Sequence, residues 1–384
     1  MRIFAKHLLT LSGWQDGMVV ETGGGVIRKV YPGTDGDLQA EYLTPGLLDV
    51  HAHGGEGFYY YEPDRGLLEK YLMRAAQCGV TDVLYSTGTL PDYTDTMEMA
   101  EAAMADQAAG KLGGACIRGV HLEGPFLSPR RTGAMNGDWM PVPSPEAFDE
   151  RFGKYVRLIR MVTIAPEREG ARELTEHLLK KGIKVQSGHT DATYEEAQAA
   201  FGWGVDSQCH TFNAARGIHH REPGVVTAAL LNKNVYCEVI CDFKHLHPAA
   251  VELIYRMKGP EKMEIISDSV AVTGLPDGEH VINGRKYLIV DGTQRVKGGN
   301  TLSGGACYLD GSVRNLISIG IPSEDVFRMA SRTPAERLGL ERIGRIKPGC
   351  EAQLAAWNGE WACEFTMIGD RIYENNRQNL SGKR

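Results

Sequence analysis

Eight short apolar runs, each separated from the next by a stretch long enough for a helix, dominate the middle of the sequence. They cover residues 47–50, 81–85, 117–122, 161–164, 183–186, 206–209, 236–240 and 264–266. The helical candidates are 65–78, 93–109, 171–181, 193–203 and 248–257, with 306–319 and 323–338 after the last run. Alternating strands and helices favour βαβ units, and eight such units match a closed barrel. We therefore predict an α/β protein built around a (β/α)8 TIM barrel.

The two ends of the chain have a different texture, with short strand-like runs and no helical period. Three consecutive glycines and the pair Pro32-Gly33 interrupt the first of these segments, as turns do between strands. We expect residues 1–44 and 343–384 to form one small β-sandwich domain from both chain termini. Residues 45–342 would form the barrel domain. The glycine-rich stretch 273–305 is expected to be irregular.

The bulk composition excludes several classes of protein. The 384 residues are 42% hydrophobic and 24% charged, which is ordinary for a globular protein with a sizeable core. A net charge of −7 argues against a surface for nucleic acid or an anionic membrane. No window reaches the roughly 18 apolar residues of a membrane span, and no secretory signal is evident. The eight cysteines form no Cys-x-x-Cys pair, so we expect free thiols in a cytoplasmic protein.

Residues that bind divalent metals follow five of the eight apolar runs. They are His51, His53, Glu123, His189, His210 and Asp268. The carboxyl ends of barrel strands meet at one mouth, which is where barrel active sites lie. Because alternate strand residues point to the same face, His51 and His53 place two imidazoles side by side. Imidazole and carboxylate ligands suit zinc, iron, manganese, cobalt or nickel, so the pattern predicts a metal-dependent hydrolase.

Each of these residues also has an ordinary structural interpretation when taken alone. A short His-x-His pattern fits one buried and one exposed histidine, and a glutamate before Gly124-Pro125 fits a charged turn. His121 is either a partner that orients a metal ligand or a core histidine. Asp268 is either a turn cap or the general base that takes a proton from a metal-activated water and returns it to a leaving amine. Their common register after the strands favours the metal site.

Longer strings make the interpretation more specific. They are PGLLDVHAHG (45–54), HLEGPFLSP (121–129), TIAPE (163–167), SGHTDATY (187–194), CHTFNAARGIHHREPGVV (209–226), HLHP (245–248), SDS (267–269) and GNTLSGGA (299–306). With these strings the chain resembles the N-acetylglucosamine-6-phosphate deacetylases of the amidohydrolase superfamily over nearly its whole length. The resemblance implies a TIM barrel with a small β-sandwich. It also implies removal of acetate from an N-acetyl amino sugar 6-phosphate.

The same resemblance implies a ligand set and a substrate site. Glu123, His189 and His210 would hold one divalent metal, and His51, His53, Glu123 and Asp268 a second. Glu123 would take the bridging place of the carbamylated lysine of many superfamily members, with Asp268 as catalytic base and acid. Substrate contacts are implied for Ala134, Met135, Asn213, Ala214, Arg221, His245, Leu302 and Ser303. Arg221 would reach the phosphate across a homodimer interface.

Two departures from the family pattern leave the substrate open. The family usually reads Gly-Ala-His where this chain has Gly133-Ala134-Met135, and a thioether donates no hydrogen bond. It commonly reads Asp-Gly where this chain has Asp242-Phe243, with Lys244 next. We hypothesise that Met135 and Phe243 reshape the pocket for a related sugar, such as N-acetylgalactosamine 6-phosphate or an unphosphorylated sugar. Further alternatives are a cyclic-amide or deaminating amidohydrolase and a catalytically silent barrel that senses a sugar phosphate.

Overall fold

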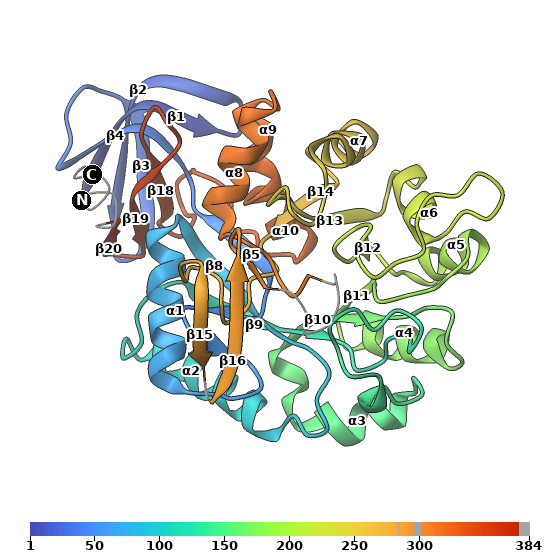
Figure 1. The fold of residues 1–384 in the computed structure, drawn as a ribbon. Helices are drawn as coiled ribbons and strands as arrows, with labels where there is room; N and C mark the ends of the chain where they lie inside the picture. Colours follow the sequence, from blue (N-terminus) through green and yellow to red (C-terminus); the bar gives the residue numbers. More distant parts are fainter. Residues whose placement is uncertain (283, 295–301, 376–384) are drawn as a thin grey trace.

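Eight parallel strands form a barrel in the middle of the chain (Figure 1). The computed structural model describes residues 1–282, 284–294 and 302–375. The barrel strands are β5 (Leu47–Ala52), β8 (Val80–Thr87), β9 (Cys116–Glu123), β10 (Ile159–Ile164), β11 (Lys184–Ser187), β12 (Ser207–Gln208), β13 (Tyr236–Ile240) and β14 (Met263–Ile266). The last strand meets the first where the backbone N–H of Asp268 donates to the carbonyl of His51 at 2.9 Å. The predicted barrel is confirmed, and each predicted run is a strand.

Helices pack around the barrel at the predicted places. They are α1 (Arg65–Gln77), α2 (Thr94–Ala108), α4 (Ala171–Lys180), α5 (Tyr194–Trp203), α7 (Pro248–Lys258), α8 (Leu309–Ser318), α9 (Ser323–Met329) and α10 (Arg332–Arg337). The segment 323–338 was expected to be one helix but forms two. Pro334 lacks the N–H that a continuous helix would need at that position, which favours the break.

Two short helices were not predicted. They are α3 (Pro145–Phe152) and α6 (Val225–Leu231). The sequence of α6, VVTAALL, is apolar on every side and begins with two β-branched residues. It therefore has no helical period to detect and reads equally well as a buried strand.

Strands from both ends of the chain form one seven-stranded sheet beside the barrel (Figure 1). They are β1 (Arg2–Thr10), β2 (Gly13–Gly23), β3 (Val26–Pro32), β4 (Leu38–Pro45), β18 (Gln353–Trp357), β19 (Cys363–Ile368) and β20 (Arg371–Glu374). Strand β18 pairs antiparallel with β4 and so joins the C-terminal strands to the N-terminal ones. The sheet has an apolar core of its own, which includes Ile3, Leu43 and Leu354. The expected β domain is thus present as a single hydrogen-bonded sheet.

The stretch 273–305, which we expected to be irregular, contains a β-hairpin. Strands β15 (Gly278–Ile282), β16 (Arg285–Val290) and β17 (Thr293–Gln294) pair antiparallel in chain order. Glycines mark its turns, and Gly284 has a φ of +75°. Ile289 is buried while its neighbours Leu288 and Val290 are exposed, which is the alternation of a strand with one covered face. Residues 299–301 of the GNTLSGGA string lie outside the described residues.

All eight cysteines carry free thiols, and six of them are buried. In the part of the chain that the structure describes, no helix combines the length and the apolar character needed to span a membrane.

Candidate metal centre

Six side chains from five strand ends meet at the mouth of the barrel. His51 lies in β5 and His53 follows it, Glu123 ends β9, and His189, His210 and Asp268 follow β11, β12 and β14. The last three have positive φ angles of 45°, 22° and 49°. Such backbone conformations cost a non-glycine residue roughly 1–3 kcal/mol and cluster at functional sites. The structure therefore brings together all six residues that the sequence singled out.

Glu123 lies at the centre of this cluster. Its Oε1 atom is 2.8 Å from Nε2 of His210 and 3.1 Å from Nε2 of His189. The two Nε2 atoms are 3.1 Å apart, and all three side chains are buried. Nδ1 of His189 donates to the carbonyl of Arg131 at 2.8 Å, which leaves Nε2 available to bind a metal. These three ligands coincide with the first metal set that the resemblance implies.

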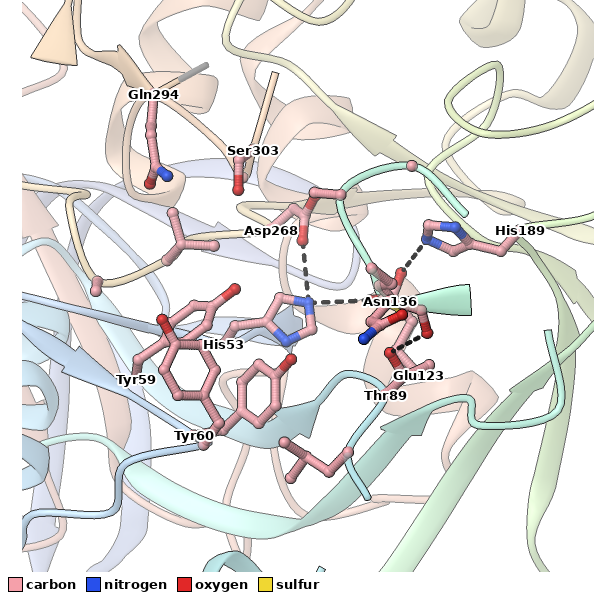
Figure 2. A pocket seen from close by; sticks show the side chains of 18 of the residues that line it. His53, Tyr59, Tyr60, Thr89, Glu123, Asn136, His189, Asp268, Gln294 and Ser303 are labelled. Atoms are coloured by element: carbon pink, nitrogen blue, oxygen red, sulfur yellow. Dashed lines mark hydrogen bonds and ion pairs between the residues drawn. The ribbon is translucent and has the colours of Figure 1, made fainter. Parts of the chain in front are cut away.

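His51, His53 and Asp268 form a second group beside the first. Nε2 of His53 is 3.2 Å from Oε2 of Glu123 and 3.3 Å from Oδ1 of Asp268 (Figure 2). Nε2 of His51 is 3.2 Å from Nε2 of His53 and 3.4 Å from Oε1 of Glu123. Glu123 thus lies between the two groups, where a carboxylate can bridge two cations.

The electrostatics of the cluster fit bound cations. Burial works to raise the pKa of Glu123, but the histidines around it, His51 first, hold that pKa well below its usual range. Burial works to lower the pKa of His51, but the Glu123 carboxylate raises it well above its ordinary value. The carboxylates are therefore stabilised by positive charge close to them. In each of the two groups, two imidazole nitrogens face each other. A divalent cation satisfies both conditions and displaces the imidazole protons.

A buried polar network behind His51 was not predicted. Glu238 on β13 lies 3.1 Å from Nδ1 of His51, and its second oxygen is 3.6 Å from Arg337 on α10. Arg337 also pairs with Glu264 on β14 at 2.7 Å. These side chains are buried, and a buried charge needs partners of this kind. A signal was present in the sequence, because YCEVI and MEII each carry a glutamate within an apolar run.

His121 is the other histidine whose role the sequence left open. Its Nδ1 lies 3.1 Å from the Ser86 hydroxyl and its Nε2 lies 2.8 Å from the Thr163 hydroxyl. Burial lowers its pKa well below the ordinary value, so the ring is neutral. It packs edge-on against His51 with ring centroids 4.5 Å apart. His121 is thus a core histidine that supports a ligand by packing.

The cluster of six side chains lies at one side of a cavity of about 940 Å³ (Figure 2). Most residues expected to contact substrate line it, namely Ala134, Met135, Asn213, Ala214, His245, Leu302 and Ser303. Arg221 is the exception: it is exposed outside this cavity, 2.6 Å from Nε2 of His220. Phe243 packs against the apolar core and does not line the cavity. The structure therefore does not support the hypothesis that Phe243 reshapes the pocket, whereas Met135 is in place to do so.

His245 is held by the turn that precedes it. Oδ2 of Asp242 lies 2.8 Å from Nδ1 of His245, and Oδ1 accepts from the backbone N–H groups of Lys244 and His245, both at 2.9 Å. Burial opposes ionisation of Asp242, but the His245 hydrogen bond lowers its pKa to about 2. This ionic contact leaves the other ring nitrogen of His245 for the cavity.

Part of the cavity wall was not predicted from the sequence. Tyr59, Tyr60 and Tyr61 line it together with Lys286, Tyr287 and Gln294 of the hairpin. The hydroxyls of Tyr61 and Tyr287 are 3.0 Å apart and join the two segments. The tyrosines follow β6 (Gly54–Gly55), with the first of them ending β7 (Phe58–Tyr59). Three consecutive tyrosines just after the His-x-His pair were a signal that could have found them.

Comparison with known proteins agrees with this barrel and site. The chain belongs to the amidohydrolase family, whose model matches residues 42–376. It is 33% identical over 356 residues to an N-acetylgalactosamine-6-phosphate deacetylase from Escherichia coli O157:H7, covering 92% of this chain and 93% of the relative. It is 31% identical over 380 residues to an N-acetylglucosamine-6-phosphate deacetylase from Vibrio furnissii, covering 96% of this chain and 94% of the relative.

A solved structure extends the likeness to three dimensions. It is a mutant N-acetyl-D-glucosamine-6-phosphate deacetylase from Mycobacterium smegmatis in complex with N-acetyl-D-glucosamine-6-phosphate. The two chains are 29% identical with a TM-score of 0.88, over 97% of this chain and 99% of that one.

Proposed function

We propose that this protein hydrolyses the acetamido group of an N-acetyl amino sugar 6-phosphate, with N-acetylglucosamine 6-phosphate as the principal substrate. The observation that carries the proposal is the convergence of Glu123, His189 and His210, within 3.1 Å of one another, beside a large cavity. The named activities of the relatives supply the substrate class. A cavity of about 940 Å³ also lies within the roughly 300–1,000 Å³ typical of small-molecule sites.

The ligand set fits one or two divalent cations, of zinc, iron, manganese, cobalt or nickel. A cation bound here would lower the pKa of its water from about 15.7 toward about 7 and polarise the acetyl carbonyl. Asp268 takes the proton of the attacking water and then delivers it to the departing amine. Burial favours the protonated acid, but the His53 hydrogen bond keeps the pKa of Asp268 below its ordinary value. Asp268 is therefore ionised and ready to accept the proton.

The sugar phosphate would be held by the remaining cavity residues. Asn213, Ala214, His245, Leu302 and Ser303 would contact the sugar, with Ala134 and Met135 on the loop beside His189. Arg221 would bind the phosphate of a neighbouring subunit, since a guanidinium suits bidentate phosphate contact. Its exposure outside its own cavity supports that role in a homodimer. The protein would act in the cytoplasm.

A second substrate is favoured by one comparison. The relative from Escherichia coli O157:H7 that is 33% identical is named for N-acetylgalactosamine 6-phosphate. This sugar differs from the first only in the configuration of one hydroxyl, and both would present the same acetamido group to Asp268. The two substrates therefore share one mechanism and differ in contacts to the sugar ring.

An acetate-release assay tests the proposal. Purified protein with added divalent metal is given N-acetylglucosamine 6-phosphate, N-acetylgalactosamine 6-phosphate or unphosphorylated N-acetylglucosamine. We expect kcat/KM for the first to exceed that for the unphosphorylated sugar about 100-fold, the worth of one or two charged hydrogen bonds. A His210→Ala preparation controls for contaminating enzymes. A preference for the galactose epimer would replace the sugar but keep the reaction, whereas no acetate from any of them would refute the proposal.

A further inference from the structure

Tyr60 is a buried residue that lines the same cavity. The residue is only 6% exposed, and its ring centroid lies 5.4 Å from that of His53 (Figure 2). Among residues 1–282, 284–294 and 302–375, none forms a hydrogen bond with the Tyr60 hydroxyl. A hydroxyl at the cavity wall that has no partner among these residues is free to donate a hydrogen bond to a bound molecule. A phenol, whose ordinary pKa is about 10, keeps its proton at neutral pH.

The local packing gives this hydroxyl its position. A Cβ atom on residue 88 would lie 2.2 Å from Oη of Tyr60 and 3.4 Å from Cε of Met135. Gly88 therefore leaves the room that the hydroxyl occupies, and Tyr60 and Met135 meet over one backbone position. The Met135 thioether has no proton to donate. The hydroxyl of Thr89 already faces the carbonyl of Asn136 at 3.5 Å. Tyr60 is thus the side chain placed to supply a donor at this point of the wall.

We propose that Tyr60 donates a hydrogen bond to the acyl oxygen of the substrate as that oxygen gains negative charge. The inference rests on the proposed deacetylation. The acyl group must lie against the cluster of candidate metal ligands to be attacked. His53, which belongs to that cluster, is in ring contact with Tyr60. A fixed donor aimed at developing charge stabilises the transition state more than the ground state. The phenol proton stays on Tyr60, and proton transfer remains with Asp268.

The isosteric variant Tyr60→Phe tests the inference. We expect kcat to fall about 100-fold, as when one oxyanion donor is removed, with KM changed less than about threefold. The temperature of unfolding should not fall, because none of the described residues forms a hydrogen bond with the hydroxyl that is removed. Tyr85→Phe is the matched control: Tyr85 is buried, lies outside the cavity, and its hydroxyl is 3.0 Å from that of Thr96. The kcat of Tyr85→Phe should equal that of the wild type.

Restoring a donor from the neighbouring position gives a second readout. Adding Met135→His to Tyr60→Phe should recover at least about tenfold in kcat, because the new ring reaches the same region. No recovery would count against the inference. So would a wild-type kcat in Tyr60→Phe, a rise in KM alone, or a loss of thermal stability larger than in Tyr85→Phe. Each of these results leaves wild-type deacetylation intact, whereas an inactive wild type would overturn the proposed function and this inference together.

Discussion

Oε2 of Glu238 lies 3.1 Å from Nδ1 of His51. Nδ1 is on the edge of the ring opposite Nε2, the atom that faces Nε2 of His53. A carboxylate that accepts the Nδ1 proton fixes the tautomer of a ligand histidine and raises its basicity. Glu238 is itself held by Arg337 and by the side-chain amide of Gln186 at 3.3 Å. His51 is therefore oriented by a chain of buried contacts that runs through Glu238 to Arg337 on α10.

Replacing Glu238 by glutamine should weaken metal binding at the group formed by His51, His53 and Asp268. Loss of such a supporting carboxylate typically costs 10–100-fold in metal affinity, and we expect a decrease of about that size. Titration against a competing chelator measures it. Glu195→Gln, an exposed change on α5, serves as the control. Equal affinity in the two variants would show that Glu238 does not support the site.

Asp268→Asn should remove proton transfer while leaving the backbone in place. Asparagine tolerates the positive φ of residue 268, so the loop should keep its shape. We expect kcat to fall about 1,000-fold, within the range for loss of a general acid–base. Metal should remain at the Glu123 group. Steady-state kinetics and elemental analysis of the same sample check both points, and a near-normal kcat would defeat the role of Asp268.

The two metal groups should respond differently to loss of a histidine. His210→Ala removes a ligand from the group centred on Glu123 and should abolish measurable turnover, because only Glu123 and His189 would remain to hold that cation. His53→Ala alters only the second group and should keep the first metal with residual activity. Metal content per chain and acetate release, measured together, distinguish the variants. If His53→Ala lost all metal while His210→Ala kept it, the assignment of the two groups would be reversed.

The interior glutamate Glu264 should make stability depend on pH. Burial raises its pKa to about 7, although Arg337 opposes the shift. The folded protein therefore holds this proton more tightly than the unfolded chain. As pH rises from about 5 to about 8, this group makes the free energy of unfolding fall. Glu264→Gln removes the titration, so the variant should gain stability relative to wild type over that range.

Chemical denaturation of both proteins, at several pH values and in excess metal, measures this difference. If the free energy of unfolding of the variant instead fell relative to wild type at higher pH, the ion pair with Arg337 would keep Glu264 charged in the folded state.

The barrel and the ligand positions could be predicted because both leave local marks in the sequence. A parallel strand covered on both faces reads as an apolar run. Glu123 stands directly after one such run, and Asp268 stands two residues after another. Common placement at strand ends then implied that residues far apart in the sequence meet. No knowledge of the loops was needed for this step.

The parts that could not be predicted depend on distant contacts. Arg337 was expected only as part of a helix, and nothing near it in the sequence indicates that it enters the barrel to meet Glu238 and Glu264. The orientation of Tyr60 depends on Gly88, which lies on a different strand end. The hairpin of β15 and β16 was missed because its turn glycines resemble those of an irregular loop. Tertiary packing, and not local propensity, decides each of these features.

Locating the metal tests the central claim most directly. Crystals of the zinc-loaded protein, measured on both sides of the zinc absorption edge, give the position of the ion from its anomalous scattering. We predict a peak about 2.0–2.2 Å from Nε2 of His189, Nε2 of His210 and an oxygen of Glu123. Zinc bound only elsewhere on the chain, with no peak among these three side chains, would contradict the account.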